Sequence, residues 1–144
     1  MVAMSLTSRN RTLRSHFGAD RHSTLSAGTL YFALFRGDPF GAGTEPTSTG
    51  GYARVAKAND ATLWGTIGVT DTLVANNGAS GTIAWPMATG LYSITLGLDY
   101  WAVFDNSTGG TLLYGGPLST AITVTGAGDV PRIPAGALTV SQQG

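Results

Sequence analysis

Histidine, cysteine and carboxylate side chains are the groups that could carry catalysis or bind a metal here, and they are few. The chain of 144 residues has two histidines, eight acidic residues and no cysteine. His16 and His22 flank Asp20, and these three groups could in principle gather a metal ion. Their spacing fits neither a pair of ligands one helical turn apart nor a zinc finger. We therefore expect surface histidines, and no metal or other cofactor.

The carboxylates are scattered, and four of them stand in turn sequences. Each of the four has Gly, Pro, Ala or Asn beside it, a setting in which an aspartate side chain bonds the local backbone: Asp38, Asp60, Asp105 and Asp129. No serine occurs in a Gly-x-Ser-x-Gly setting, and both histidines precede residue 28, so a serine nucleophile would have no base in the folded part. The sequence predicts no enzymatic activity.

Aromatic residues are the remaining candidates for binding, because an exposed ring can stack on a sugar or a base. The chain offers seven of them for such a surface: Tyr52, Trp64, Trp85, Tyr92, Tyr100, Trp101 and Tyr114. In strands that are apolar on both faces, such rings more often belong to the core or to a subunit interface. We favour the core and the interface.

The composition is that of a chain of short strands and frequent turns. Charged residues make up 11% of the sequence, glycine occurs 21 times, and the formal net charge is zero. The overall charge therefore does not favour nucleic acid or a membrane as a partner. No apolar run is long enough to span a membrane, and the first residues do not form a signal peptide, so we expect synthesis in the cytoplasm.

Residues 1–27 differ from the rest because half of the eight basic residues lie there. A short helix capped by Ser5 or Ser8 is one interpretation. We expect an arm that docks on a partner, and a frayed leader is the alternative. The residues assigned to docking are Arg9, Arg11, Arg14, Phe17 and Arg21.

A β-hairpin organises the remainder. Two apolar runs, over residues 98–104 and 111–118, flank turn formers that close with Gly109-Gly110. The first run is apolar on both faces, so both must be covered. We assign Tyr100, Phe104 and Leu112 to the core, and Trp101 and Val103 to an interface with a neighbouring subunit.

Further strands are expected along the chain. The segment 29–35 is the strongest, with Tyr31 and Leu34 in the core; 51–56, 63–64, 67–74, 82–86, 91–96, 121–125 and 132–140 add strand material. Asn77-Gly78 in the stretch 76–78 predicts a hairpin between 67–74 and 82–86. The sequence thus predicts an all-β fold, an antiparallel β-sandwich or jelly-roll-like domain over residues 28–144, preceded by the arm.

Five groups of motifs resemble, in the same order, a family of small bacteriophage virion proteins commonly labelled phage tail fibre proteins. They are Leu30-Tyr-Phe-Ala-Leu-Phe35 with Gly37-Asp-Pro39, Gly51-Tyr-Ala-Arg-Val55, Ile83-Ala-Trp-Pro86 with Ala88-Thr-Gly90, Val103-Phe-Asp105 with Thr108-Gly-Gly-Thr-Leu-Leu113, and Gly128-Asp-Val-Pro-Arg-Ile-Pro-Ala-Gly-Ala-Leu138. The resemblance covers about residues 28–141 and implies no catalytic residues.

The resemblance implies a non-enzymatic structural protein of the virion. Three hypotheses follow. The first is an oligomeric module, expected to be a homotrimer, that decorates or cements the capsid through contacts with the major capsid protein. The second is a tail fibre or tail tip component, in which the loop over residues 36–51 contacts the host surface. The third, of another class, is a carbohydrate-binding module or a lytic enzyme, and the missing acid–base pair counts against the enzyme.

Overall fold

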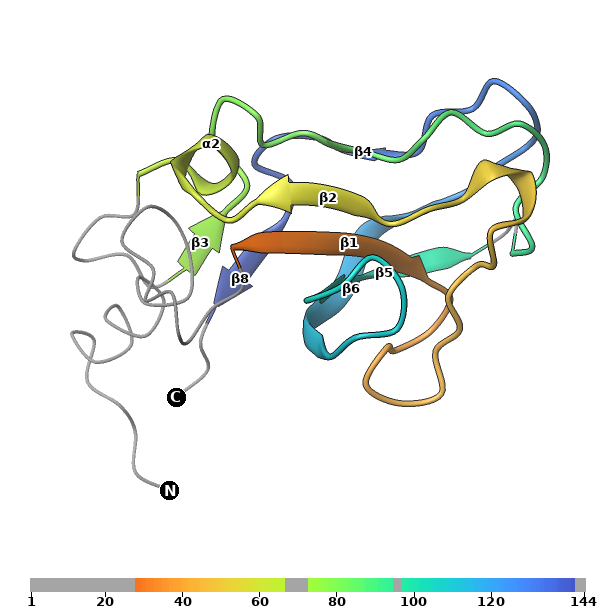
Figure 1. The fold of residues 1–144 in the computed structure, drawn as a ribbon, viewed down its shortest axis with the longest axis horizontal. Coiled ribbons are helices and arrows are strands. Elements are labelled where there is room, and N and C mark those ends of the chain that lie inside the picture. The colour runs from red at the N-terminus through yellow and green to blue at the C-terminus, as the bar shows by residue number, and fades with distance from the viewer. Residues whose placement is uncertain (1–27, 67–72, 95–96, 142–144) are drawn as a thin grey trace. The chain divides into compact units, whose positions relative to one another are not determined.

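The computed structural model describes residues 28–66, 73–94 and 97–141 (Figure 1). The elements, in order, are β1 (Thr29–Phe35), the 3-10 helix η1 (Thr49–Gly51), β2 (Val55–Ala58), α2 (Ala61–Trp64), β3 (Leu73–Ala75), β4 (Ile83–Ala84), β5 (Leu98–Phe104), β6 (Leu112–Ile122), β7 (Arg132–Ile133) and β8 (Thr139–Ser141). The antiparallel all-β class is confirmed. The expected N-terminal helix, His16, His22 and residues 67–72 lie outside the described residues.

The chain divides into two compact units, each assembled from separate stretches of sequence. Unit 1 comprises Met1–Thr29, Ala58–Thr82 and Ile133–Gly144, and unit 2 comprises Leu30–Lys57 and Ile83–Arg132. Both units contain residues of the single domain expected over residues 28–144.

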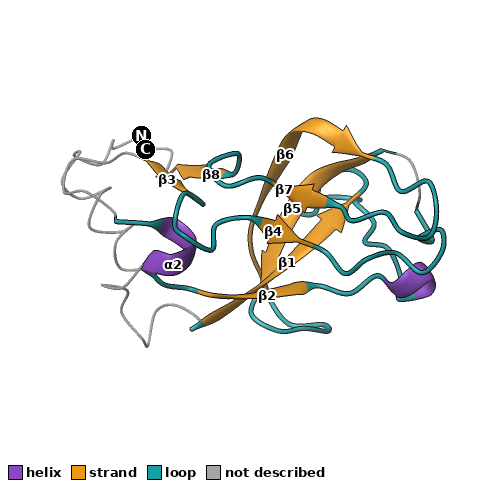
Figure 2. Cartoon of the chain, turned by 90° about the horizontal axis from the view of Figure 1, so that it is seen from above, coloured by secondary structure: helices purple, strands orange, loops and turns teal. Residues whose placement is uncertain are grey.

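A four-stranded sheet in the order β2-β1-β5-β6 forms the framework of unit 2 (Figures 1 and 2). β1 and β5 pair antiparallel with Leu34 opposite Trp101, and β5 and β6 pair antiparallel with Ala102 opposite Gly115. Both β1 and β5 have the bounds expected from the sequence, because each is an uninterrupted run of apolar residues between turn formers.

The hairpin of β5 and β6 is confirmed, together with its Gly-Gly closure. Gly109 and Gly110 have φ values of 60° and 75°, a backbone conformation that side chains disfavour. A Cβ at Gly110 would in addition collide with the Asp105 carboxylate. β6 runs on to Ile122 and so takes in the first two residues of the separate strand expected at 121–125, whereas residues 123–125 are not in a strand. Pro117 lies in this outermost strand of the sheet, where a missing N–H is tolerated.

Both faces of the sheet are buried, and the face that carries Trp101 is buried more completely than the face that carries Phe104. The Trp101 face carries side chains that are at most 6% exposed: Phe32, Leu34, Trp101 and Val103. The Phe104 face has Ala33, Phe35, Ala102 and Phe104 buried, and three partly buried side chains packed against them, those of Tyr31, Tyr100 and Leu112.

The burial of the two faces differs in part from the expectation. Trp101 and Val103 are 6% and 1% exposed in the single chain, so residues of the same chain already cover them. Burial of Trp101 and Val103 therefore does not require a neighbouring subunit. Tyr100, expected in the core, is only partly buried, whereas Leu34 and Phe104 are buried.

A loop of the chain itself covers part of the Phe104 face. Residues 36–44 fold back between two backbone hydrogen bonds that join Arg36 and Thr44, of 3.0 and 2.9 Å. A Cβ at Gly115 would lie 2.9 Å from Cγ of Pro39 and 3.2 Å from Cε2 of Phe40, so the loop packs directly on the sheet there. Ala33, Ala102 and Gly115 lie side by side across β1, β5 and β6, and their small size leaves room for this loop.

In unit 1, residues 63–64 are helical rather than the expected strand. Asp60 caps α2 by accepting a hydrogen bond from the N–H of Thr62 at 2.8 Å, and Gly65, with φ of 69°, ends it. The Nε1–H of Trp64 donates to Oδ1 of Asn59 at 2.8 Å. The Asp60 cap and the hydrogen bond of the buried Trp64 indole thus stabilise one turn of helix instead of a strand.

The hairpin expected around residues 76–78 does not form, so this prediction is wrong. β3 pairs with β8, and β4 pairs with β7. Asn76 is fully buried, and its side chain donates to the carbonyls of Gly81 and Pro134, at 2.8 and 3.1 Å, and accepts from the N–H of Leu138 at 2.9 Å. This asparagine joins two separate stretches of unit 1, residues 58–82 and 133–144, so tertiary hydrogen bonds override the local turn preference.

Truncation of Phe104 tests the core of unit 2. We expect Phe104→Ala to lower the free energy of unfolding by about 3–5 kcal/mol, because it leaves a cavity in place of a well-packed ring. Phe40→Ala is the matched control, since that ring is 62% exposed. Urea unfolding followed by circular dichroism measures both. Equal losses in the two variants would contradict the assignment of Phe104 to the core.

Candidate functional site

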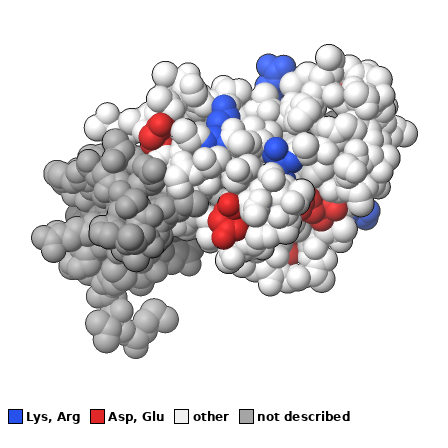
Figure 3. Space-filling model, viewed as in Figure 1, with Lys and Arg blue, Asp and Glu red and all other residues white. Residues whose placement is uncertain are grey.

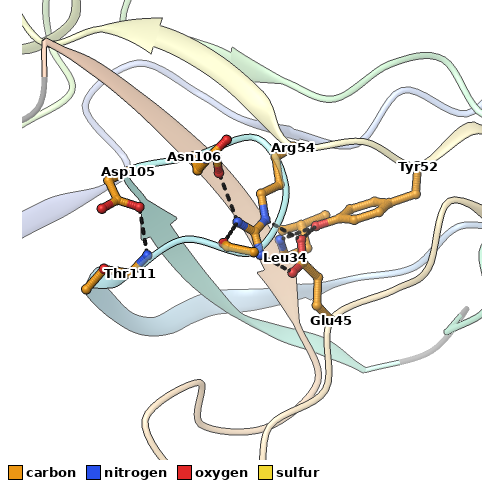
Figure 4. Close-up of polar contacts among 8 residues, drawn as sticks. Leu34, Glu45, Tyr52, Arg54, Asp105, Asn106 and Thr111 are labelled. Atoms are coloured by element: carbon orange, nitrogen blue, oxygen red, sulfur yellow. Dashed lines mark hydrogen bonds and ion pairs between the residues drawn. The ribbon is translucent and has the colours of Figure 1, made fainter.

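The most connected polar cluster in unit 2 is centred on Arg54, which follows Tyr52 and Ala53 just before β2 (Figure 4). Its guanidinium makes a two-pronged ion pair with Glu45, Nε to Oε1 at 2.8 Å and Nη2 to Oε2 at 2.7 Å. The Arg54 side chain is 8% exposed and that of Glu45 is 21% exposed. Planar, charge-assisted pairing of this kind is stronger and more directional than a surface ion pair.

The same guanidinium reaches the turn of the hairpin. Nη1 donates to the carbonyl oxygens of Asn106 and Gly109, at 3.0 and 2.8 Å. Its Cζ lies 3.6 Å from the centroid of the Phe104 ring, within the range of a cation–π contact. Within the turn, Oδ1 of Asp105 accepts from the N–H of Thr111 at 2.7 Å. Arg54 therefore ties the β5–β6 turn to the segment that leads into β2.

Tyr52 extends the cluster to the edge of β1. Its hydroxyl donates to Oε1 of Glu45 at 2.9 Å and accepts from the N–H of Leu34 at 3.1 Å. The tyrosine thus supplies a hydrogen-bond partner for a backbone N–H of β1, as a neighbouring strand would. Together, Glu45, Tyr52 and Arg54 connect β1, the loop before η1 and the hairpin turn; we call these three residues the Arg54 cluster.

Burial has a marked effect on the acidity of Tyr52. It raises the pKa of the Tyr52 hydroxyl well above the ordinary value of 10, and the adjacent Glu45 carboxylate acts in the same direction. Burial also raises the pKa of Tyr92 and of Tyr114. Tyr52 is thus held in its neutral form, in which it can donate to Glu45.

The four turn carboxylates behave as the sequence predicts. Asp38, Asp60, Asp105 and Asp129 each accept a hydrogen bond from a backbone N–H within six residues. The backbone N–H and the hydroxyl of Thr125, followed by the N–H of Gly126, lower the pKa of Asp129. These acids organise turns, as short polar side chains in Gly-rich segments do.

The aromatic side chains proposed for stacking are mostly inside. Tyr52, Trp64, Trp85, Tyr92 and Trp101 are at most 6% exposed, so none of these five rings presents a face to a sugar or a base. The docking residues Arg9, Arg11, Arg14, Phe17 and Arg21 lie outside the described residues. Among the residues described, no three His, Cys, Asp or Glu side chains come together as a metal site, and no helix is long and apolar enough to cross a membrane.

Sequence reasoning did not single out Glu45 and Arg54. A signal was present, since Tyr52 and Arg54 alternate on one side of an extended segment. Their partner Glu45 stands in a polar loop, however, and the turn carbonyls of residues 106 and 109 are more than 50 residues away in sequence. Contacts of this kind arise only from the pairing of β1 with β5.

The fold and this site define an all-β structural module, in which charged side chains fasten one part of the sheet to another. A family model described as "Podophage GP4 fiber I protein gp80" matches residues 3–141. The chain therefore belongs to this family of phage fibre proteins and is a structural component of the virion, which confirms the resemblance seen in its motifs. No curated protein matches the sequence.

Replacing Arg54 tests the role of the cluster. Arg54→Ala should lower the free energy of unfolding by about 3–5 kcal/mol, because it leaves the Glu45 carboxylate without its partner in a largely buried place. Arg54→Lys keeps the charge but loses the two-pronged geometry, so we expect a smaller loss. Urea unfolding measures the series. An Arg54→Ala variant as stable as the parent would show that the cluster contributes nothing.

Alkaline pH tests the buried tyrosine. In the unfolded chain Tyr52 ionises near pH 10, whereas in the folded chain its raised pKa keeps it neutral. The unfolded state therefore binds fewer protons above this pH, and the free energy of unfolding should fall as pH rises beyond about 10. Tyr52→Phe removes this contribution and should flatten the dependence between roughly pH 9 and 11. Identical slopes in thermal melts of the two proteins would contradict it.

Proposed function

We propose that this protein is a building block of a phage fibre and acts through contacts with other proteins rather than through chemistry on a substrate. The observation that carries the proposal is the family match, which extends over residues 3–141 and so includes most of the N-terminal segment. The braced sheet of unit 2 supports it, because a fibre module transmits position and force and needs a rigid framework more than a reactive centre.

The N-terminal segment supplies the attachment in this proposal. Four arginines occur within residues 9–21, and Asp20 is the only acid among the first 37 residues. Such a segment fits an acidic surface on another virion protein. Docking through arginines would weaken steeply with salt, because exposed charges are screened over about 10 Å at roughly 0.1 M.

Location and copy number on the particle test the proposal. Immunogold electron microscopy should place the protein on the tail, and quantitative mass spectrometry of purified particles should give far fewer copies than of the major capsid protein. Gold spread over the head, with copies comparable to those of the major capsid protein, would make the protein a capsid decoration module and contradict a fibre role.

Charge reversal of Arg9, Arg11 and Arg14 is the matched variant for this experiment. The variant should fold, because the charges lie outside the strands described, yet be absent from particles. Particles that incorporate it fully would show that the arginines are not the anchor, whereas the location measured for the parent protein would stand. Binding of a soluble glycan by the parent would instead favour a carbohydrate-binding module.

A further inference from the structure

The dipeptide Asn77-Gly78 does not close a hairpin and lies instead against the end of α2, the short helix of unit 1 (Figure 1). All four backbone carbonyls of α2 accept a hydrogen bond. In order from Ala61 to Trp64, the donors are the backbone N–H groups of Gly65, Ser80 and Gly78 and the side-chain nitrogen of Asn77. Segment 77–80 thus supplies three of the partners that the end of a helix lacks on its own.

Two of these hydrogen bonds involve groups of Asn77 and Gly78 that can react with each other. The Gly78 N–H donates to the carbonyl of Leu63 at 3.0 Å. The side-chain atom of Asn77 that faces the carbonyls of Trp64 and Ala75, at 2.5 and 3.3 Å, is the amide nitrogen, because a carbonyl oxygen can only accept a hydrogen bond. The backbone nitrogen of Gly78 and the side-chain amide of Asn77 are therefore each bonded to a carbonyl of α2.

Glycine is required at position 78. A Cβ there would collide with the carbonyl groups of Ala61 and Thr62, because the backbone passes close to the helix. In an unfolded chain, the absence of a side chain also lets the Gly78 nitrogen approach the Asn77 side chain with little hindrance. The contact with α2 thus demands a dipeptide in which asparagine is prone to deamidation.

Deamidation of an Asn-Gly pair is an intramolecular substitution followed by hydrolysis. The Gly78 nitrogen gives up its proton to a base in the solvent and attacks Cγ of Asn77. The new C–N bond closes a succinimide ring, the bond between Cγ and Nδ2 breaks, and Nδ2 takes up a proton and leaves as ammonia. Water then opens the ring and leaves either aspartate or isoaspartate at position 77.

We propose that Asn77 is a deamidation site that the folded protein protects, and that segment 77–80 must detach from α2 before the reaction can proceed. While the hydrogen bonds to Leu63 and Trp64 are in place, the Gly78 nitrogen keeps its proton and the Asn77 side-chain amide is not free to rotate. Asn77 is exposed to solvent, so the protection comes from these hydrogen bonds and not from exclusion of water. The inference concerns the chemistry of unit 1 and does not depend on the proposed function.

The carboxylate that the reaction leaves opposes a return of the segment to α2. It has no hydrogen to donate, and it is repelled by the carbonyls of Trp64 and Ala75 that the amide nitrogen faces. The described residues of unit 1 contain no Lys or Arg that could compensate the new charge, and in the space-filling view the Lys and Arg side chains are few and lie apart from one another (Figure 3). Deamidation should therefore leave α2 without its cap.

Peptide mass spectrometry of the full chain tests the protection by following the conversion of Asn77 with time. In native buffer at mildly alkaline pH, conversion should be about 100-fold slower than in the same chain unfolded in concentrated guanidinium chloride at that pH. Three hydrogen bonds between segment 77–80 and α2 must break first, and each slows the reaction by about fivefold. Equal rates in the folded and unfolded chain would overturn the proposal, and so would a lack of conversion in the unfolded chain.

Loss of the Asp60 cap should open the site. Asp60→Ala removes the side chain that accepts from the N–H of Thr62, so α2 opens more often and conversion in native buffer should rise by about fivefold. Asp38→Ala is the matched control and should leave conversion at Asn77 unchanged, because Asp38 accepts from the N–H of Phe40 in a turn of unit 2. An Asp60→Ala protein that converts no faster than the parent would contradict the role of α2.

If Asp60→Ala did not fold by circular dichroism, the parent protein in sub-denaturing guanidinium chloride would replace it. Conversion should then rise with denaturant, and a rate independent of denaturant would count against opening as the route.

Asn77→Asp reproduces the charge of the product and tests its effect on α2. Hydrogen exchange at the amides of Gly78 and Ser80 should become at least about fivefold faster, because the side chain can no longer donate to Trp64. Asn106→Asp is the matched control, since Asn106 is an exposed turn residue of unit 2, and it should leave these two amides unchanged. Exchange of both amides at the parent rate in Asn77→Asp would show that the Asn77 amide does not hold the segment on α2, and would overturn the inference.

Discussion

The burial of β5 on both faces is the constraint that shapes unit 2. A strand with Trp101 and Val103 on one side and Ala102 and Phe104 on the other can leave neither side to water, because each large apolar side chain contributes about 1.5–3 kcal/mol when removed from it. The chain covers the Trp101 face almost completely. The Phe104 face is covered by different means, with Pro39 and Phe40 packed over Gly115 and the Arg54 guanidinium over the Phe104 ring.

Polar side chains link the separate segments that cover the Phe104 face. Arg54 lies over an apolar ring and is largely buried, so its charge requires Glu45 and the turn carbonyls as partners. Glu45 in turn receives the Tyr52 hydroxyl, which completes the hydrogen bonding of β1 at Leu34. The ion pair and the Tyr52 hydroxyl together connect β1, a loop and a hairpin turn that are far apart in sequence. These contacts link distant parts of unit 2 and use only two charged side chains, those of Arg54 and Glu45.

The parts of the structure that the sequence predicted well depend on local chemistry. β1 and β5 are uninterrupted apolar runs, the Gly109-Gly110 closure needs positive φ values, and four aspartates in turn sequences bond their own backbone. Each of these follows from a few neighbouring residues. The same reasoning failed where distant residues decide: Asn76 forms a buried junction instead of a hairpin turn, because Pro134 and Leu138 supply its partners.

Which face of β5 is more open was likewise beyond local reasoning. Two-sidedness follows from the sequence, but the choice of cover depends on the loop over residues 36–44 and on Arg54, which reach the sheet only after β1 has paired with β5. The Arg54 cluster was missed for the same reason. None of its residues stands out in the local sequence, because Arg54 makes its contacts with the turn carbonyls of residues more than 50 positions away.

Hydrogen exchange at the amide of Leu34 tests most directly whether the Arg54 cluster locks the hairpin to β1. This N–H has the Tyr52 hydroxyl, at 3.1 Å, as its partner. The cluster predicts that it exchanges as slowly as the amides at the centre of β5, and that Arg54→Ala speeds its exchange while the amides that pair β3 with β8 in unit 1 keep their rates. Exchange of Leu34 in the parent protein at the rate of an exposed loop amide would contradict this account.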